Sequence, residues 1–143
     1  MRTTTLNRHL LTPLLILLPI CIKANEINAG SYQLETRMLL PHLEEMRRTV
    51  TTKIRCINEN DIHALFPILM QPGMAGCRLV KGRSTNQQTT YSLKCPGKNA
   101  AEGTALLRKT ENGVSAELNA KMGGKNMTFS QSSNAMRLGA CSN

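Results

Sequence analysis

The sequence has few of the residues on which catalysis and nucleic-acid binding depend. It contains no tryptophan, two tyrosines and two phenylalanines, whereas proteins that bind single-stranded nucleic acid interleave aromatic side chains with basic ones. We therefore expect no nucleic-acid partner. The chain also lacks the G-x-S-x-G, H-E-x-x-H and phosphate-loop motifs. These absences argue against an enzyme and predict no bound cofactor.

Acidic and histidine side chains are too sparse to suggest a catalytic group. Asp61 is the single aspartate of the chain, and two histidines, His42 and His63, follow the N-terminal region. Asp61 and His63 are two positions apart, and residues at that spacing do not share a helix face. We interpret them as residues at the start of a helix.

The first 24 residues have the features of a secretory signal peptide. Arg2 and Arg8 precede an apolar run over 10–22, and Ala24 is a suitable small residue for cleavage. The run is shorter than the roughly 20 residues of a membrane-spanning helix. We therefore expect export to the periplasm, a mature domain over 25–143, and no integral membrane segment. A lipoprotein anchored at Cys21 is disfavoured by the bulky Ile20 before it.

Cleavage after Ala24 leaves four cysteines, an even number in an exported chain, which indicates two disulfides. Zinc is disfavoured because no C-x-x-C pair occurs. Residues 77–95 show alternating patterning on both sides of a polar centre, which predicts a β-hairpin. Folding it about Asn86 places Cys77 opposite Cys95, at a separation that a disulfide can span.

By elimination, the second disulfide joins Cys56 to Cys141. Its geometry is harder to satisfy, because Met136, Leu138 and Ala140 look like the inward-facing set and Cys141 has the other parity. A β-bulge at Gly139 would reset the alternation.

Alternation and turn residues predict a mainly β fold. We expect strands over 30–38, 49–56, 104–109, 114–122, 126–130 and 135–141 in addition to the two hairpin strands, with turns at 111–113, 123–124 and 132–134. Val50, Thr52, Ile54 and Cys56 are predicted to face inward. About eight antiparallel strands in meander order would form a single sheet that closes into a barrel or bends strongly.

One segment departs from the strand pattern. Residues at about 59–67 predict a short helical insertion between the second and third strands, started by Asn58 or Asn60 and interrupted at Pro67. Its apolar residues suit either a plug in the core or a lid over a ligand cavity. The candidate lid residues are Ile62, Leu65, Phe66 and Leu69.

The cysteine pattern leads to a family resemblance. Gly30-Ser31-Tyr32, then Cys56, Cys77, Cys95 and the terminal Gly139-Ala140-Cys141, resemble the small exported proteobacterial proteins of the domain-of-unknown-function 3617 family. The family often has tryptophan where this chain has Tyr32 and Tyr91. The resemblance implies a periplasmic β-rich domain and implies no activity.

Charge and methionine content suggest what such a domain would bind. Without the signal peptide the chain has 15 basic and 9 acidic residues, so an anionic envelope component is a candidate partner. Our preferred hypothesis is a non-enzymatic binding module for an apolar small ligand or a partner protein. The alternative is a periplasmic copper-binding module, because thioether ligands select Cu(I). Methionine is also a common filler of irregular cores. The mature methionines are Met38, Met46, Met70, Met74, Met122, Met127 and Met136.

Overall fold

The computed structural model describes residues 26–40, 49–98, 100–124 and 127–142. The predicted signal peptide, its cleavage site and Cys21 lie outside the described residues, as do His42, Met46 and the predicted strand start at Asn126.

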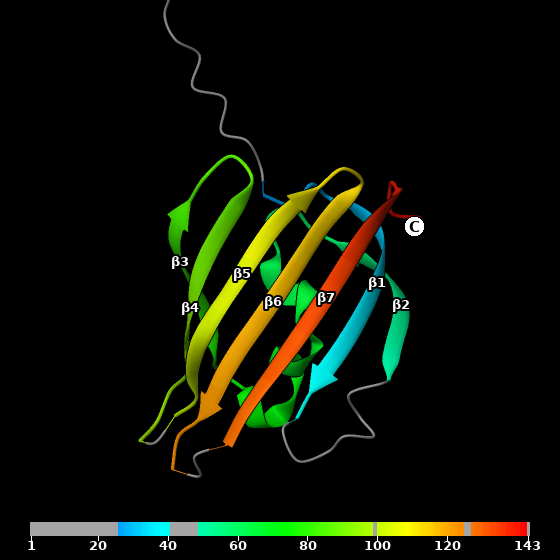
Figure 1. Cartoon of the computed structure of the whole chain (residues 1–143). Coiled ribbons are helices and arrows are strands. Elements are labelled where there is room, and N and C mark those ends of the chain that lie inside the picture. The colour runs from blue at the N-terminus through cyan, green and yellow to red at the C-terminus, as the bar shows by residue number, and fades with distance from the viewer. Residues whose placement is uncertain (1–25, 41–48, 99, 125–126, 143) are drawn as a thin grey trace, which may run out of the picture.

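Seven strands form one antiparallel sheet (Figure 1). Their order in the sheet is β2-β1-β7-β6-β5-β4-β3. The strands are β1 (Gly30–Leu39), β2 (Val50–Ile57), β3 (Arg78–Ser84), β4 (Gln88–Lys94), β5 (Glu102–Thr110), β6 (Gly113–Met122) and β7 (Met127–Gly139).

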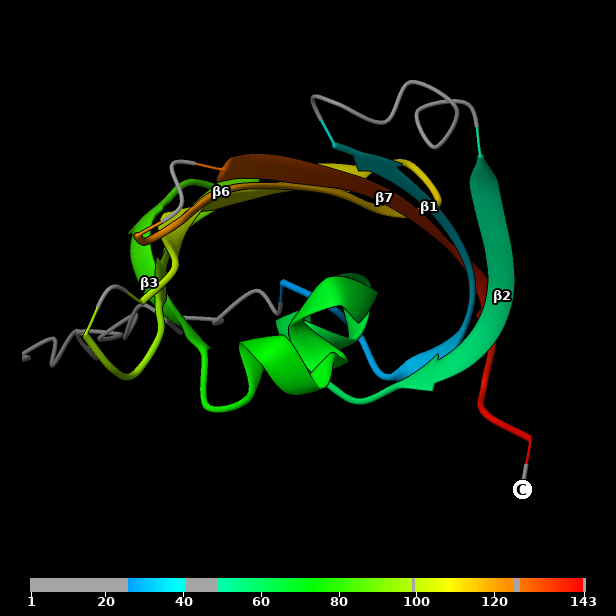
Figure 2. The ribbon, with the colours of Figure 1, turned by 90° about the horizontal axis from the view of Figure 1, so that it is seen from below.

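This order is an open meander. Strands that are neighbours in sequence pair with each other, apart from β2 and β3, and β7 returns to pair with β1. Among the described residues β2 and β3 do not pair with each other, so they form the two edges of the sheet. The sheet curves strongly around the segment that connects these two strands (Figure 2). The prediction of a mainly β, strongly bent antiparallel meander is confirmed.

The connecting segment contains three short 3-10 helices: η1 (Ile62–Leu65), η2 (Pro67–Met70) and η3 (Pro72–Met74). The Asp61 carboxylate accepts a hydrogen bond from the Ala64 N–H (3.3 Å) and caps η1, the role that the sequence assigned to Asn58 or Asn60. Pro67 and Pro72 each occupy the start of the next helix, because proline lacks the N–H that a continuing helix would use.

The core lies between the concave face of the sheet and this insertion. Small residues on the concave face, including Gly103, Ala105, Ala116 and Ala135, leave room for large side chains of the insertion. The largest fully buried side chains are Tyr32, Phe66, Ile27, Leu34, Ile57, Leu65, Leu93, Leu107 and Leu118.

The predicted turn at 132–134 is wrong. The chain runs through it as one 13-residue strand, β7, so the sheet has seven strands and not eight. Gln131 and Ser133 are buried on the concave face. Polar residues in this stretch suggested a loop, but the Ser133 hydroxyl accepts a hydrogen bond from Gln131 inside the core, and Asn134 projects from the exposed face.

The predicted inward face of β2 is also wrong. Val50 and Ile54 are 45% and 69% exposed. The register with β1 pairs Arg55 with Tyr32 and Lys53 with Leu34, whose side chains are buried on the concave face. Because β2 is an edge strand, the core covers only its last residue, Ile57.

The inward assignment of Met136 and Leu138 is wrong as well, because the register places Ala135, and not Met136, opposite the buried Leu34 of β1. Both are about half exposed, while Ala135 is buried. The β1–β7 register shifts at Leu138, so Ser31 pairs with Gly139 and Tyr32 with Arg137. This is the bulge that the cysteine parity required. Ser31 also pairs with Cys56, so the bulge brings the end of β7 to the same level of the sheet as Cys56.

The two predicted hairpins are present. Leu79 pairs with Leu93, which aligns Cys77 with Cys95. In the β5–β6 hairpin the turn consists of Glu111 and Asn112, and Gly113 already pairs with Thr110. A Cβ on Gly113 would lie 2.0 Å from the Ala135 carbonyl oxygen, so glycine permits the close approach of β6 to β7.

Candidate functional site

The segment before β1 is tied into one end of the curved sheet. The Glu26 N–H donates to the Asn60 side chain (3.0 Å), and the Asn60 N–H donates to the Ile27 carbonyl (3.1 Å). Asn60 makes these contacts in the left-handed region, at φ 57°. Ile27 is buried, so the ordered domain extends to within two residues of the predicted cleavage site.

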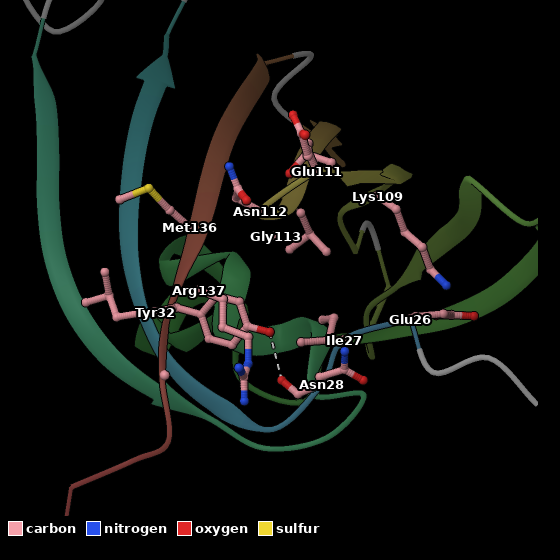
Figure 3. Close-up of a pocket in the computed structure, with 14 residues that line it drawn as sticks. Glu26, Ile27, Asn28, Tyr32, Lys109, Glu111, Asn112, Gly113, Met136 and Arg137 are labelled. Carbon is pink, nitrogen blue, oxygen red and sulfur yellow. Dashed lines mark hydrogen bonds between the residues drawn. The ribbon is translucent and has the colours of Figure 1, made fainter.

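A hollow of about 460 Å³ lies beside this segment. We call it the N-terminal pocket. It is bounded by residues 26–28, the β5–β6 turn and the end of β7. Figure 3 shows the Tyr32 ring beside Arg137 on one side, with Lys109 and Glu26 on the other.

Several polar side chains around the N-terminal pocket already have protein partners. The Tyr32 hydroxyl donates to the Asn28 carbonyl (2.8 Å), and Arg137 donates to the Ala29 carbonyl (3.1 Å). The Glu26 carboxylate accepts from the Tyr91 hydroxyl and pairs with Lys81. These contacts fasten the N-terminal segment, which gives the pocket a structural explanation.

A second hollow, of about 320 Å³, lies between η2 and the inner face of β1 and β2. We call it the β2–η2 groove. The described residues that line it carry no charge; they are Thr36, Met38, Thr49, Thr51, Pro67, Ile68, Gln71 and Gln131. Apolar side chains and threonine methyl groups therefore make up much of its wall.

The wall of the groove is held in place by Gln131. Its carboxamide oxygen accepts from the Ile68 N–H (3.1 Å), and its nitrogen donates to the Leu65 carbonyl (3.4 Å) and to the Ser133 hydroxyl (3.1 Å). This one side chain joins β7 to the insertion. The sequence analysis did not identify Gln131. A signal that could have pointed to it is Pro67, because a proline there leaves neighbouring backbone groups in need of a side-chain partner.

The four candidate lid residues lie in the core. Leu65 and Phe66 have no exposed surface, and Ile62 and Leu69 are also buried. They line neither the N-terminal pocket nor the β2–η2 groove.

Both predicted cysteine pairs are disulfides in the structure: Cys77–Cys95 and Cys56–Cys141, which are 18 and 85 residues apart. The first links the residue before β3 to the residue after β4. The second links the chain after β7 to β2, across the beginning of β1, where Ser31 pairs with both Gly139 and Cys56. Structural disulfides indicate an oxidising compartment.

The described methionines occupy different surroundings. Met74 is buried, Met38 and Met122 are partly buried, and Met70, Met127 and Met136 are exposed. The Met70 sulfur accepts a hydrogen bond from Arg55 (3.2 Å). Across the described ranges, no group of three or more His, Cys, Asp or Glu residues could hold a metal ion.

The fold defines the class of this protein: a small, disulfide-linked β domain whose open, curved sheet surrounds three short 3-10 helices. Residues 27–141 match the family described as a protein of unknown function (DUF3617). The chain belongs to this family, as its cysteine pattern suggested. No curated protein and no solved structure matches the chain. In the part of the chain that the structure describes, no helix is long and apolar enough to cross a membrane.

Proposed function

We propose that this protein is a non-catalytic binding protein of the periplasm that takes a small apolar ligand in the β2–η2 groove. The observation that carries the proposal is the uncharged wall of that groove. Its volume, about 320 Å³, lies within the range of small-molecule sites, roughly 300–1,000 Å³. The two disulfides and the apolar N-terminal run support the location.

The groove is also suitably supported. Gln131 accepts a hydrogen bond from the backbone of η2, the helix that contributes Pro67 and Ile68 to the groove wall. The packed core lies behind this wall. A rigid wall reduces the ordering cost of binding, because few side chains must be immobilised when the ligand enters.

A neutral fluorophore whose emission rises in apolar surroundings, such as N-phenylnaphthylamine, tests the proposal. We expect saturable binding to the oxidised, exported protein and displacement by decanol. Thr51→Trp fills the groove from the edge strand and should weaken binding by about tenfold or more. Thr52→Trp is the matched control, because Thr52 projects from the opposite face of the same strand.

Two results would reject the proposal. One is a fluorescence increase that does not saturate. The other is an equal loss of binding in Thr51→Trp and Thr52→Trp, which would place the site elsewhere.

A further inference from the structure

We propose that the ligand of the β2–η2 groove is an anionic amphiphile, an apolar chain ending in a carboxylate or phosphate, and that Lys53 binds its charged end. This inference rests on the proposed function, since it assigns a ligand class to the same groove.

The first argument is the orientation of β2. One face of β2 carries Thr51, Lys53 and Arg55. These residues pair with Thr36, Leu34 and Tyr32 of β1, respectively. Tyr32 and Leu34 are buried on the concave face. Lys53 and Arg55 therefore lie on the concave side of this edge strand, where Lys53 is exposed and Arg55 is partly buried.

The second argument is that a basic side chain on this face of β2 contacts the insertion. The Arg55 guanidinium lies 3.2 Å from the Met70 sulfur at the end of η2. Arg55 on β2 and Met70 on η2 are thus in contact between the edge of the sheet and the insertion. Met70 remains 57% exposed. On the same face of β2, Lys53 and then Thr51 precede Arg55, and Thr51 lines the groove.

The third argument is distance. Residues two apart on a strand are separated by about 6.6 Å, so Lys53 stands one such step from Thr51. The lysine stem has four carbons and can carry the ammonium over that step while its methylenes cover apolar surface. Its charge can therefore lie at the mouth of the groove.

The fourth argument is charge. The ion pairs among the described residues are Lys81–Glu26 and Arg108–Glu117, and neither uses Lys53 or Arg55. Within the part of the chain that the structure describes, the groove is lined by no charged side chain. An uncharged hollow with a cationic rim complements a molecule with an apolar body and one anionic end.

The test compares ligands that share one chain and differ in the head group. Decanoate, decyl phosphate, decanol and decyltrimethylammonium would each displace the neutral fluorophore below their micelle concentrations. We expect decanoate or decyl phosphate to bind about tenfold more tightly than decanol, and decyltrimethylammonium to bind most weakly. The better of the two anions identifies the head group. The preference should shrink with added salt, because the site is exposed.

Lys53→Gln should remove most of that preference while leaving decanol affinity unchanged. Lys121→Gln is the matched control, because Lys121 is exposed on the convex face of β6. Equal affinity for decanoate, decyl phosphate and decanol would overturn the inference while leaving the proposed function intact. A preference that survives Lys53→Gln would overturn the assignment to Lys53. Failure of the fluorophore itself to bind would reject the proposed function.

Discussion

The side-chain oxygen of Gln131 accepts a hydrogen bond from the backbone N–H of Ile68, 63 residues away in sequence. The same carboxamide donates to the Leu65 carbonyl. Two backbone groups that Pro67 and the short helices leave without helical partners are therefore satisfied by one side chain of β7. The insertion is fastened to the sheet by this contact as well as by apolar packing.

Replacing Gln131 should destabilise the fold. Gln131→Leu keeps the size of the side chain but leaves the Ile68 N–H and the Leu65 carbonyl without a partner, which costs about 1–3 kcal/mol. Urea unfolding followed by circular dichroism measures the change. Gln88→Leu is the control, since Gln88 is exposed on β4 and its replacement should alter stability by less than about 0.5 kcal/mol. Equal stability of the two variants would show that the Gln131 contact is dispensable.

Phe66→Ala distinguishes a plug from a lid. Phe66 is fully buried, so in a plug its truncation should cost about 3–5 kcal/mol through lost burial and a cavity. In a lid the cost should be much smaller, and apolar-probe binding should change instead. Met70→Ala is the comparison, because Met70 is largely exposed. We expect the plug result by urea unfolding, and a loss below about 1 kcal/mol for Phe66→Ala would contradict it.

Disulfide connectivity can be checked directly. Peptide mapping without reduction should recover Cys77 linked to Cys95 and Cys56 linked to Cys141. Replacing both Cys77 and Cys95 by alanine should lower the free energy of unfolding by about 2–4 kcal/mol, because the hairpin loop is no longer constrained in the unfolded chain. A peptide joining Cys56 to Cys77 would be incompatible with the observed strand register.

Gly113→Ala should lower the free energy of unfolding far more than its matched control, Gly73→Ala. A methyl group at 113 would meet the Ala135 carbonyl, whereas one at 73 would meet nothing within 4 Å. Forcing β6 and β7 apart should cost about 2 kcal/mol or more. Thermal unfolding of both variants measures the difference, and similar melting temperatures would refute this explanation of Gly113.

Copper binding is the alternative to a packing role for the methionines. Met70 is exposed and Met74 is buried, so we expect the protein to lose Cu(I) to a competing chelator of about micromolar affinity. Stoichiometric retention of Cu(I), weakened by Met70→Leu or Met74→Leu, would establish a site instead. The wild-type titration against the chelator decides between these outcomes.

The sequence by itself determined the parts of this fold in which strands adjacent in sequence pair with each other. The hairpin over 77–95 and the inward face of β6, from Val114 to Ala120, follow from alternation across a short turn, because side chains two apart on a strand share a face. The Cys77–Cys95 pairing follows from the same register. The proline at 67 likewise marks where one helical turn ends and the next begins.

Only the tertiary structure decided the rest. Val50 and Ile54 alternate like core residues, but β2 is an edge strand and its register with β1 directs them outward. Gln131 and Ser133 look like loop residues, yet partners from a distant segment satisfy their hydrogen bonds inside the core. The β2–η2 groove is lined by β1, the start of β2, η2 and Gln131, which are far apart in sequence. Each of these outcomes depends on contacts between distant segments, which local alternation and turn propensity do not encode.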